Sequence, residues 1–381
     1  MEIIFVLLGL GLLLVAVVVF RKSPQKRKDS SEHTSSVQSA KPKPKKKTLK
    51  NLPKVKHEKF TPKHELYYNS LSNFHSKVSD FDTTEGYLAA ACQDGSINLF
   101  KFQSLNQKSF NYLQAKLERD EPSAIAINKA GNLVVTAGLY YRKIHLFAPK
   151  SESGKKTLQE VRTFNSGHTR NICGIGVSES CIVTCGEDVD THVIFWGFDG
   201  TQLAVYNTNQ LKNNSLAFQR DLQMLSVATW MGSARVIQMQ AKKGSEEFEK
   251  YLSIMDLSGH SKGLSCIYFT PAMEAVTCSI DGTVKVWNTN VKWHLKEDPK
   301  VLFQFKTSTI PYASHSVLTK DLLVLAHESR IEFYNRKNLQ MLDCVEKAHG
   351  TNIQKISVYK DYLLSQASEG RINIWNLPVS S

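Results

Sequence analysis

A histidine, a serine and an aspartate, the residue types of a hydrolase triad, occur in one short stretch as His260, Ser279 and Asp281. In such a triad the histidine takes the proton of the serine nucleophile. Ser279, however, lies inside an apolar run that is typical of a strand. It is also not at the centre of a Gly-x-Ser-x-Gly turn, which would expose a nucleophile. Trp287 ends the next run and indicates a structural role for the set, so we do not expect a hydrolase.

Signatures of metal and cofactor binding are weak. Cys173, Cys181 and Cys185 are close in sequence, but they lie in apolar runs and no second cysteine pair follows, as a zinc site would need. The acidic stretch at 188–192 lacks the glycine and the distant glutamate of a calcium-binding EF-hand. Walker, dinucleotide-binding and His-Glu-x-x-His motifs are also missing from the sequence. We therefore expect no catalytic residues, no metal and no cofactor, and we do not expect an enzyme.

A strand-like pattern, apolar–x–apolar–aromatic, recurs along the chain and often follows an Asp-Gly turn. Its instances end at residues 100, 147, 196, 239, 287, 334 and 375, with the aromatic residue replaced by Met239 in the fourth. The intervals between these ends are 41 to 49 residues. Such a period indicates one supersecondary unit per repeat, with neighbouring units stacked to bury their apolar faces.

The repeats resemble those of the WD40 family, in which Gly-His and Trp-Asp marks bracket each unit. Gly167-His168 and Gly259-His260 precede the third and fifth ends, whereas no Trp-Asp occurs at any end, so the repeats are divergent. The resemblance implies an all-β, seven-bladed propeller, which we place at residues 65–381. A ring of sheets needs closing, and in the resembled family the amino-terminal segment often supplies the outermost strand of the last blade, which implies that Glu65–Tyr68 does so here.

The resemblance also implies a structural hydrogen-bond tetrad in the fifth repeat, made by His260, Ser279, Asp281 and Trp287. In the first, third and seventh repeats the serine position is taken by Cys92, Asp188 and Ala367. We therefore expect the tetrad to be eroded outside the fifth repeat.

Two predicted hairpins between the second and third strands of a repeat are unusually apolar. They carry the partner-binding candidates Tyr140, Tyr141, Trp230 and Met231. Exposed aromatic and methionine side chains are typical of binding hot spots, although the same side chains could instead pack over neighbouring loops. Trp293, in a polar stretch after the fifth repeat, has the same two interpretations and would lie on the opposite face.

The amino terminus has the composition of a membrane anchor. Residues 3–20 are 18 consecutive apolar residues, enough to span a hydrocarbon core, and no positive residue precedes them as in a signal peptide. Basic residues follow directly from Arg21, so the positive-inside tendency places the carboxyl-terminal part in the cytosol. Seven cysteines, an odd number, are expected to be reduced thiols there. We predict a single-pass signal anchor at 1–20, and a short apolar span favours the endoplasmic reticulum.

The segment at 21–64 holds 15 Lys and Arg against three Asp and Glu, a net charge of +12. The whole chain carries +13 and Glu2 is the only charged residue before position 21, so residues 65–381 carry only +2. We predict a disordered polybasic linker. Its lysines could contact lipid headgroups or RNA phosphates, or the segment could be a solvated spacer. The candidates for such contacts are Lys41, Lys43, Lys45, Lys46 and Lys47.

Together these features predict a membrane-anchored scaffold that binds cytosolic protein partners. The order of anchor, basic linker and propeller resembles that of membrane-anchored WD40 repeat proteins. That resemblance implies an endoplasmic-reticulum adaptor of the unfolded protein response, with the stress kinase PERK, RNA or the ribosome as partners. Two alternatives remain: an RNA or ribosome tether acting through the linker, and an exchange factor for a small GTPase.

Overall fold

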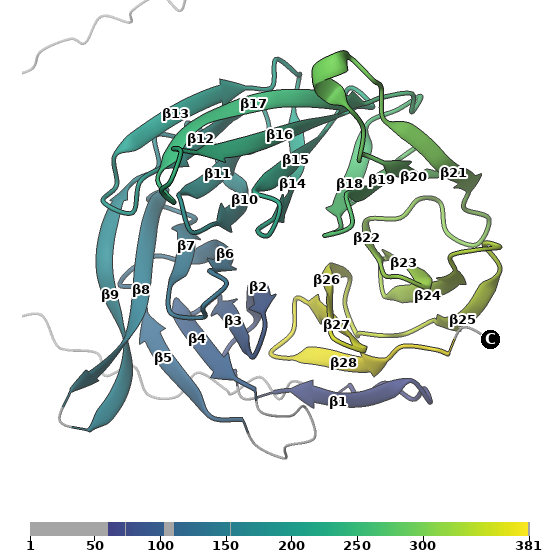
Figure 1. Ribbon diagram of the computed structural model, residues 1–381. Helices are drawn as coiled ribbons and strands as arrows, with labels where there is room; N and C mark the ends of the chain where they lie inside the picture. The colour runs from purple at the N-terminus through teal and green to yellow at the C-terminus, as the bar shows by residue number, and fades with distance from the viewer. Residues whose placement is uncertain (1–59, 73, 103–109, 153, 380–381) are drawn as a thin grey trace, which may run out of the picture. The chain divides into compact units, whose positions relative to one another are not determined.

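Residues 60–72, 74–102, 110–152 and 154–379 are described by the computed structural model. They belong to one compact unit, Glu58–Ser381. Within them, 28 strands form seven antiparallel sheets of four strands each. The sheets are arranged as blades around a common axis, with one strand of each blade nearest the centre (Figure 1). The predicted all-β, seven-bladed propeller is confirmed.

The strands run outward from the axis in chain order within blades one to six. Blades one, two and three contain the following strands: β2 (Val78–Thr84), β3 (Tyr87–Cys92), β4 (Ser96–Lys101) and β5 (Tyr112–Lys116); β6 (Pro122–Ile127), β7 (Val134–Gly138), β8 (Lys143–Glu152) and β9 (Lys155–Asn165); β10 (Ile172–Val177), β11 (Ile182–Gly186), β12 (His192–Trp196) and β13 (Gln202–Asn207).

Blades four to six continue the same order, and blade seven takes its outermost strand from the start of the propeller. These blades contain the following strands: β14 (Asn213–Gln219), β15 (Met224–Thr229), β16 (Ala234–Ala241) and β17 (Phe248–Leu257); β18 (Leu264–Phe269), β19 (Glu274–Ser279), β20 (Thr283–Asn288) and β21 (Lys300–Lys306); β22 (His315–Leu318), β23 (Leu322–His327), β24 (Arg330–Asn335) and β25 (Met341–Val345); β26 (Ile353–Tyr359), β27 (Tyr362–Ala367), β28 (Ile372–Asn376) and β1 (Tyr67–Leu71). The recurring sequence pattern falls on the third strand of each blade.

Alternate residues of a strand pack against different neighbouring blades. Along β19, Ala275 belongs to an apolar cluster shared with blade four, whereas Val276 belongs to one shared with blade six. On β20 the same division separates Trp287 from Val286. Because side chains of a strand point alternately to its two faces, each blade buries both faces between its neighbours. The blades therefore stabilise one another around the ring.

The ring closes through the amino-terminal strand β1, which pairs antiparallel with β28. Leu71 lies opposite Ile372, and the ring of Tyr67 contacts that of Trp375 edge to face at 5.5 Å between centroids. Closure by this part of the chain is confirmed, but the strand begins two residues later than Glu65. His64 and Leu66 lie in the turn before it, where Tyr67 N–H donates to the His64 carbonyl. Pairing protects the edge of β28 from other chains.

The predicted anchor at 1–20 and almost all of the linker at 21–64 lie outside the described residues. Within the described part of the chain, no helix has the length and apolar character needed to cross a membrane. All seven cysteines are free, and five of them are buried, as expected for reduced thiols.

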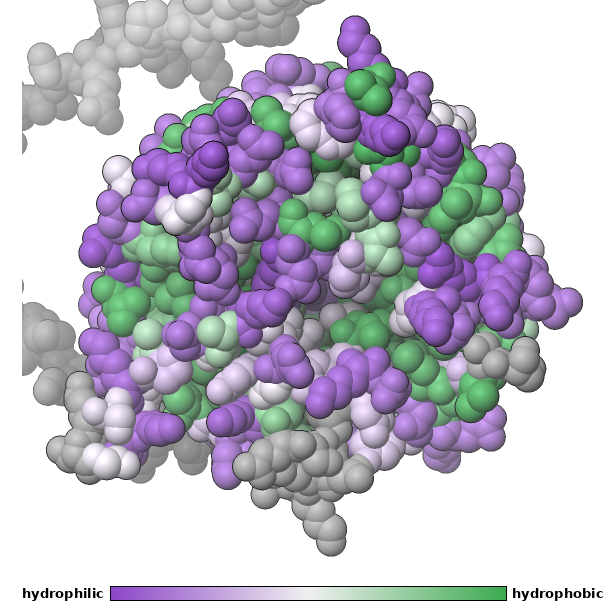
Figure 2. Space-filling view, in the orientation of Figure 1, coloured by the Kyte–Doolittle hydropathy of each residue, from purple (hydrophilic) through white to green (hydrophobic). Residues whose placement is uncertain are grey.

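Two faces of the propeller differ in the connections that they carry. The hairpins between second and third strands and the links between consecutive blades lie on one face, which we call the hairpin face. First-to-second hairpins and third-to-fourth connections lie on the opposite face. In the view of Figure 2, most of the visible surface is hydrophilic, with hydrophobic side chains in small separate groups.

Candidate functional site

The polar residues of blade five form a relay, but its hydroxyl group comes from Thr277 and not from Ser279. Trp287 Nε1 donates to Thr277 Oγ1 at 2.8 Å, and His260 Nε2 lies 2.8 Å from the same oxygen. The other imidazole nitrogen is 2.7 Å from Thr283 Oγ1, which donates to Asp281. The predicted tetrad is therefore corrected at one position, and its aspartate acts through a threonine.

Ser279 has a different role at the end of β19. Its hydroxyl donates to the carbonyl oxygens of Lys262 and Gly263 in the link that enters the blade, both at 3.1 Å. Thr277 and Ser279 are two residues apart, so they face the same side of the strand, and spacing alone could not tell which one meets His260.

Blades three and seven also hold complete relays, contrary to the expectation of erosion. In blade three, His168 and Trp196 share Thr184 Oγ1 at 2.9 and 3.0 Å, and His168 Nδ1 lies 3.2 Å from Asp190. Burial raises the pKa of Asp190. Hydrogen bonds from Thr169 and His192 and the charge of His168 have a larger, opposite effect, and the net result is a pKa lowered to about 2.

In blade seven the relay runs from Trp375 through Ser365 to His349, with distances of 2.8 and 2.7 Å. Glu369 replaces the aspartate, 3.5 Å from His349. The hydroxyl residues of blades three and seven are Thr184 and Ser365, not the Asp188 and Ala367 expected at the serine position. Like Thr277, Ser365 lies ten residues before the tryptophan, whereas Thr184 lies twelve before it, a longer spacing that follows from the longer hairpin of blade three.

A second serine, Ser261, is at the centre of a Gly-x-Ser-x-Gly pattern, Gly259-His260-Ser261-Lys262-Gly263. Its hydroxyl donates to Asp281 at 2.7 Å, and no hydrogen bond joins it to His260 among the described residues. Burial, aided by the charge of Lys285, lowers the pKa of His260 to about 4. These contacts are those of a structural turn and they lack the serine–histidine contact of a triad.

The hairpin face carries exposed apolar side chains on three consecutive blades. Each has between 49% and 67% of its surface exposed, and we call the set the apolar arc: Tyr140 and Tyr141 in blade two, Val189 in blade three, Leu211 in the next link, and Trp230 and Met231 in blade four. Elsewhere in the described residues, large exposed apolar side chains lie on outer strands, on the opposite face or at the carboxyl end. The four predicted candidates are exposed, and the ring of Trp230 also packs over Gly263 in the link that follows its blade.

Hydrogen bonds position one end of the apolar arc, and a close packing contact positions the other. In blade two, the buried carboxylate of Asp120 accepts hydrogen bonds from the backbone N–H groups of Tyr140 and Tyr141, at 2.9 and 3.4 Å. In blade four, the ring of Trp230 lies on Gly263 so closely that a Cβ there would be 3.1 Å from the ring atom Cε3. Both aromatic ends are thus positioned by the link that precedes or follows their blade.

Backbone contacts join the hairpins and links between these ends. Ser166 N–H donates to the Arg142 carbonyl at 3.0 Å, and Glu187 N–H donates to Asn171 at 2.8 Å. Asp188 forms a β-bridge with Asn213, and Trp230 N–H donates to the Lys212 carbonyl at 3.0 Å. Such a network of backbone hydrogen bonds restricts the relative motion of the three hairpins.

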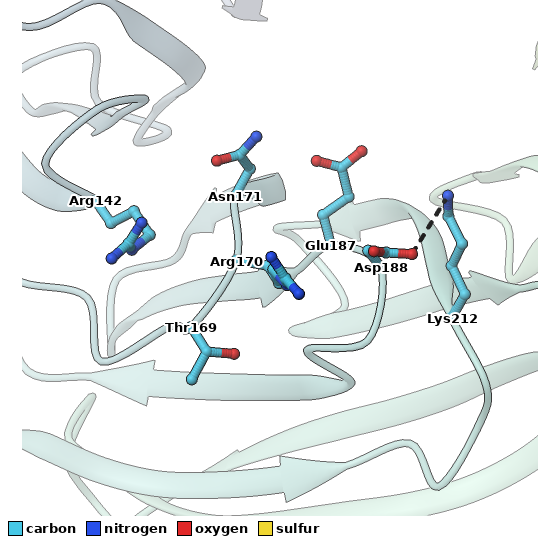
Figure 3. A pocket seen from close by; sticks show the side chains of 7 residues that line it. All are labelled: Arg142, Thr169, Arg170, Asn171, Glu187, Asp188 and Lys212. Atoms are coloured by element: carbon cyan, nitrogen blue, oxygen red, sulfur yellow. Dashed lines mark ion pairs between the residues drawn. The ribbon is translucent and has the colours of Figure 1, made fainter. Parts of the chain in front are cut away.

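An open polar cavity of about 390 Å³ lies within the apolar arc. Arg142, Arg170, Lys212, Glu187 and Asp188 line it, together with Thr169 and Asn171. Figure 3 shows Arg142 and Lys212 on opposite sides, with Arg170 between them and Lys212 pointing to Asp188. The cavity therefore presents both positive and negative groups to solvent.

Val189 and Leu211 could not be identified from the sequence, because a single apolar residue in a polar loop forms no pattern. The cavity could not be identified either, because its lining residues come from separate loops. Trp293, in the short 3-10 helix η1 (Trp293–Leu295), packs against the core cluster of blade four and is a loop anchor. The linker lysines Lys41, Lys43, Lys45, Lys46 and Lys47 lie outside the described residues. Among the described residues, no group of three or more His, Cys, Asp and Glu side chains could hold a metal ion.

Comparisons with known proteins agree with this architecture. Residues 252–288, which include the relay of blade five, match the family described as WD domain, G-beta repeat. Human transducin beta-like protein 2 is 24% identical over 323 residues, covering 82% of this chain and 72% of the relative, and the mouse protein is 23% identical with the same coverage. The solved WD40 β-propeller domain of Doa1 superposes with a TM-score of 0.59 at 12% identity, covering 82% of this chain and 96% of that domain.

The Doa1 likeness shows the fold alone, whereas the two relatives extend the similarity to the sequence across most of the chain. WD40 propellers are typically non-enzymatic scaffolds, and the fold and relatives together support a protein-interaction scaffold. The chain thus folds as a seven-bladed propeller, contains a match to a WD domain, G-beta repeat, and is similar to transducin beta-like protein 2.

Proposed function

We propose that this protein is a scaffold that binds protein partners through the apolar arc on its hairpin face. The observation that carries the proposal is the gathering of exposed aromatic and aliphatic side chains on one face of three consecutive blades. Aromatic and methionine side chains are enriched in the centres of protein interfaces, where their burial supplies most of the binding energy. The arc is held by backbone contacts, which lowers the entropy lost on binding.

We further propose that the scaffold is anchored in the endoplasmic-reticulum membrane with its propeller in the cytosol. The apolar residues 3–20 and the basic residues that follow them support this topology. Protein partners are then cytosolic proteins or cytosolic parts of membrane proteins. The resemblance to membrane-anchored WD40 proteins favours the stress kinase PERK and the translation machinery in the unfolded protein response.

The arc is tested by recovering partners with the full chain and with the double variant Tyr140→Ala and Trp230→Ala. Both side chains are about half exposed or more, so the fold is expected to persist while partner recovery falls at least tenfold. Leu295→Ala is the matched control, because it removes a similarly exposed side chain from the opposite face. Full recovery with the double variant, or loss with the control, would place the interface elsewhere.

The topology is tested by proximity labelling from the carboxyl terminus in cells, with intact chain and with a form lacking residues 1–22. Labelling of endoplasmic-reticulum kinases and translation factors by the intact form only is the expected result, and labelling of lumenal proteins would reverse the topology. Glycosylation at Asn213 is no substitute for this test. The residue begins a sequon, but its side chain is buried and donates to the Gly186 carbonyl.

A second candidate function, tethering of RNA or ribosomes, is favoured by the charge of +12 on residues 21–64. Binding through phosphate contacts releases counterions, so affinity should fall steeply with salt concentration. Deleting residues 41–50, which contain Lys41, Lys43, Lys45, Lys46 and Lys47, should abolish it. RNA association that is insensitive to salt would contradict this candidate.

A further inference from the structure

Two arginines in the polar cavity lack an acidic partner. The guanidinium groups of Arg142 and Arg170 form no ion pair with the described residues, whereas Lys212 lies 3.8 Å from Asp188. Elsewhere in the propeller most arginine side chains are paired, as Arg330 is with Glu332 and Glu346. A guanidinium presents several N–H donors in a planar fork that matches a carboxylate. The cavity therefore has free donors suited to an acidic group.

The backbone conformation at Arg142 allows a substitution that removes its side chain without strain. This residue directly precedes the third strand of blade two, with φ of 50°. The same position holds Gly95 in blade one and Gly282 in blade five, with φ of 86° and 83°. All three carbonyl oxygens accept a hydrogen bond from the backbone N–H of the residue that directly follows the fourth strand of the blade. An arginine thus occupies a left-handed turn position that holds glycine in two other blades, so glycine can replace it without backbone strain.

The surroundings of the cavity restrict the kind of ligand. Tyr141 directly precedes Arg142, and Leu211 directly precedes Lys212, so exposed apolar groups adjoin two of the three cations. Glu187 and Asp188 also line the cavity, and they would repel a densely charged polyanion such as RNA. One carboxylate flanked by apolar side chains fits both the charges and the apolar arc.

We propose that the polar cavity binds a single aspartate or glutamate side chain of an extended peptide segment in a partner protein, with flanking large apolar residues of that segment on the apolar arc. This inference rests on the proposed scaffold function and names the chemistry of the partner. The carboxylate accepts hydrogen bonds from Arg142 and Arg170, and its apolar neighbours contact Tyr141 on one side and Leu211 on the other.

The test uses the full chain, purified in mild detergent, and a random twelve-residue peptide library displayed on phage. Enriched peptides are expected to carry Asp or Glu within two positions of Phe, Trp, Leu or Ile. Synthetic forms of these peptides should bind at least tenfold more weakly to Arg170→Ala and to Arg142→Gly. They should also bind more weakly when their acidic residue is changed to glutamine.

Glu328→Gly is the matched control, because Glu328 also has a positive φ, 50°, at the same kind of hairpin in blade six, away from the cavity. Peptide binding should be unchanged in it. Arg142→Gly relieves a left-handed residue, so its thermal unfolding midpoint should not fall and lost binding cannot be attributed to misfolding.

Three results would overturn the proposal: no enriched peptide, enrichment without an acidic residue, or unchanged binding to both arginine variants. A twenty-nucleotide uridine RNA serves as the competing ligand, and loss of its binding in the arginine variants would assign the cavity to a polyanion. Failure of the cavity alone is distinguishable from failure of the scaffold function. If only the cavity assignment is wrong, the double variant Tyr140→Ala and Trp230→Ala still lowers partner recovery, whereas Arg142→Gly and Arg170→Ala do not.

Discussion

The carboxylate of Asp120 accepts a hydrogen bond from the backbone N–H of Tyr140 at 2.9 Å, across 20 residues of sequence. Asp120 lies in the link before blade two and is buried, whereas the side chain of Tyr140 is exposed on the hairpin face. A hydrogen bond to a carboxylate is stronger than one between neutral groups. A buried side chain therefore fixes the backbone of an exposed one, and the aromatic end of the apolar arc is positioned before any partner binds.

Replacing Asp120 by alanine should loosen this hairpin while both tyrosines remain. The N–H groups of Tyr140 and Tyr141 lose their acceptor, so the amide exchange of a peptide covering 139–142 should accelerate at least tenfold. Hydrogen-exchange mass spectrometry measures this directly. Glu121→Gln is the control, since the Glu121 side chain accepts a hydrogen bond from the exposed Tyr140 hydroxyl, at 3.2 Å, and does not hold the hairpin backbone. Equal exchange in both variants would show that Asp120 does not hold the hairpin.

Thr277→Val should destabilise the protein by about 1–3 kcal/mol. Valine keeps the volume of threonine but leaves Trp287 Nε1 and His260 Nε2 without the shared oxygen. Urea unfolding measures the loss. Thr277→Ser keeps the hydroxyl and serves as the control, so equal stability of the valine and serine variants would contradict the relay.

Acidification should destabilise the protein through His260. Burial and Lys285 lower the pKa of this residue from 6.5 to about 4, so between these values the unfolded chain binds more protons than the folded one. The free energy of unfolding should therefore be fully retained above pH 6.5 and fall toward pH 4, by at most about 1.4 kcal/mol per pH unit for this group.

The measurement is urea unfolding at several pH values between 7.5 and 4, in the protein and in His260→Gln. Burial also lowers the pKa of His315, so only the difference between the two slopes reports on His260. Parallel slopes would mean that His260 is protonated equally in the folded and unfolded states.

Gly263→Ala should shift the indole ring of Trp230 without removing this side chain. A Cβ at this position would lie 2.9 Å from the Trp230 carbonyl oxygen and 3.1 Å from its ring, closer than ordinary van der Waals contact. The expected result is greater quenching of tryptophan fluorescence by acrylamide and weaker partner binding. Trp230→Phe identifies the contribution of this residue to the signal, and quenching that stays the same in Gly263→Ala would rule out the close contact.

Arg142→Gly should stabilise the protein by about 1 kcal/mol, because an L-residue other than glycine is disfavoured in the left-handed region. Its midpoint of thermal unfolding should rise by a few degrees or less, as expected for a domain of this size. Glu328→Gly should show a similar rise without any effect on peptide binding. A marked fall for Arg142→Gly would indicate that its side chain stabilises the fold, which would weaken its assignment to ligand binding.

The number of blades, their order and the strand that closes the ring could be predicted from the sequence. Each blade repeats the same local pattern, and alternation along a strand such as β19 already assigns Ala275 and Val276 to opposite faces. Local periodicity and turn residues are encoded in neighbouring positions, so they can be read without knowing the tertiary contacts. The same turn pattern singled out Tyr140 and Trp230, but it left open whether their side chains are exposed or pack over neighbouring loops.

The hydrogen-bond partners and the polar cavity were decided only by the tertiary structure. Thr277 and Ser279 share one side of a strand, and the approach of His260 from the preceding link selects the first of them. Likewise, Arg142, Arg170 and Lys212 come from three loops whose meeting depends on the packing of three blades. Contacts between residues far apart in sequence follow from how whole sheets pack, and a single sequence carries no local signal for them.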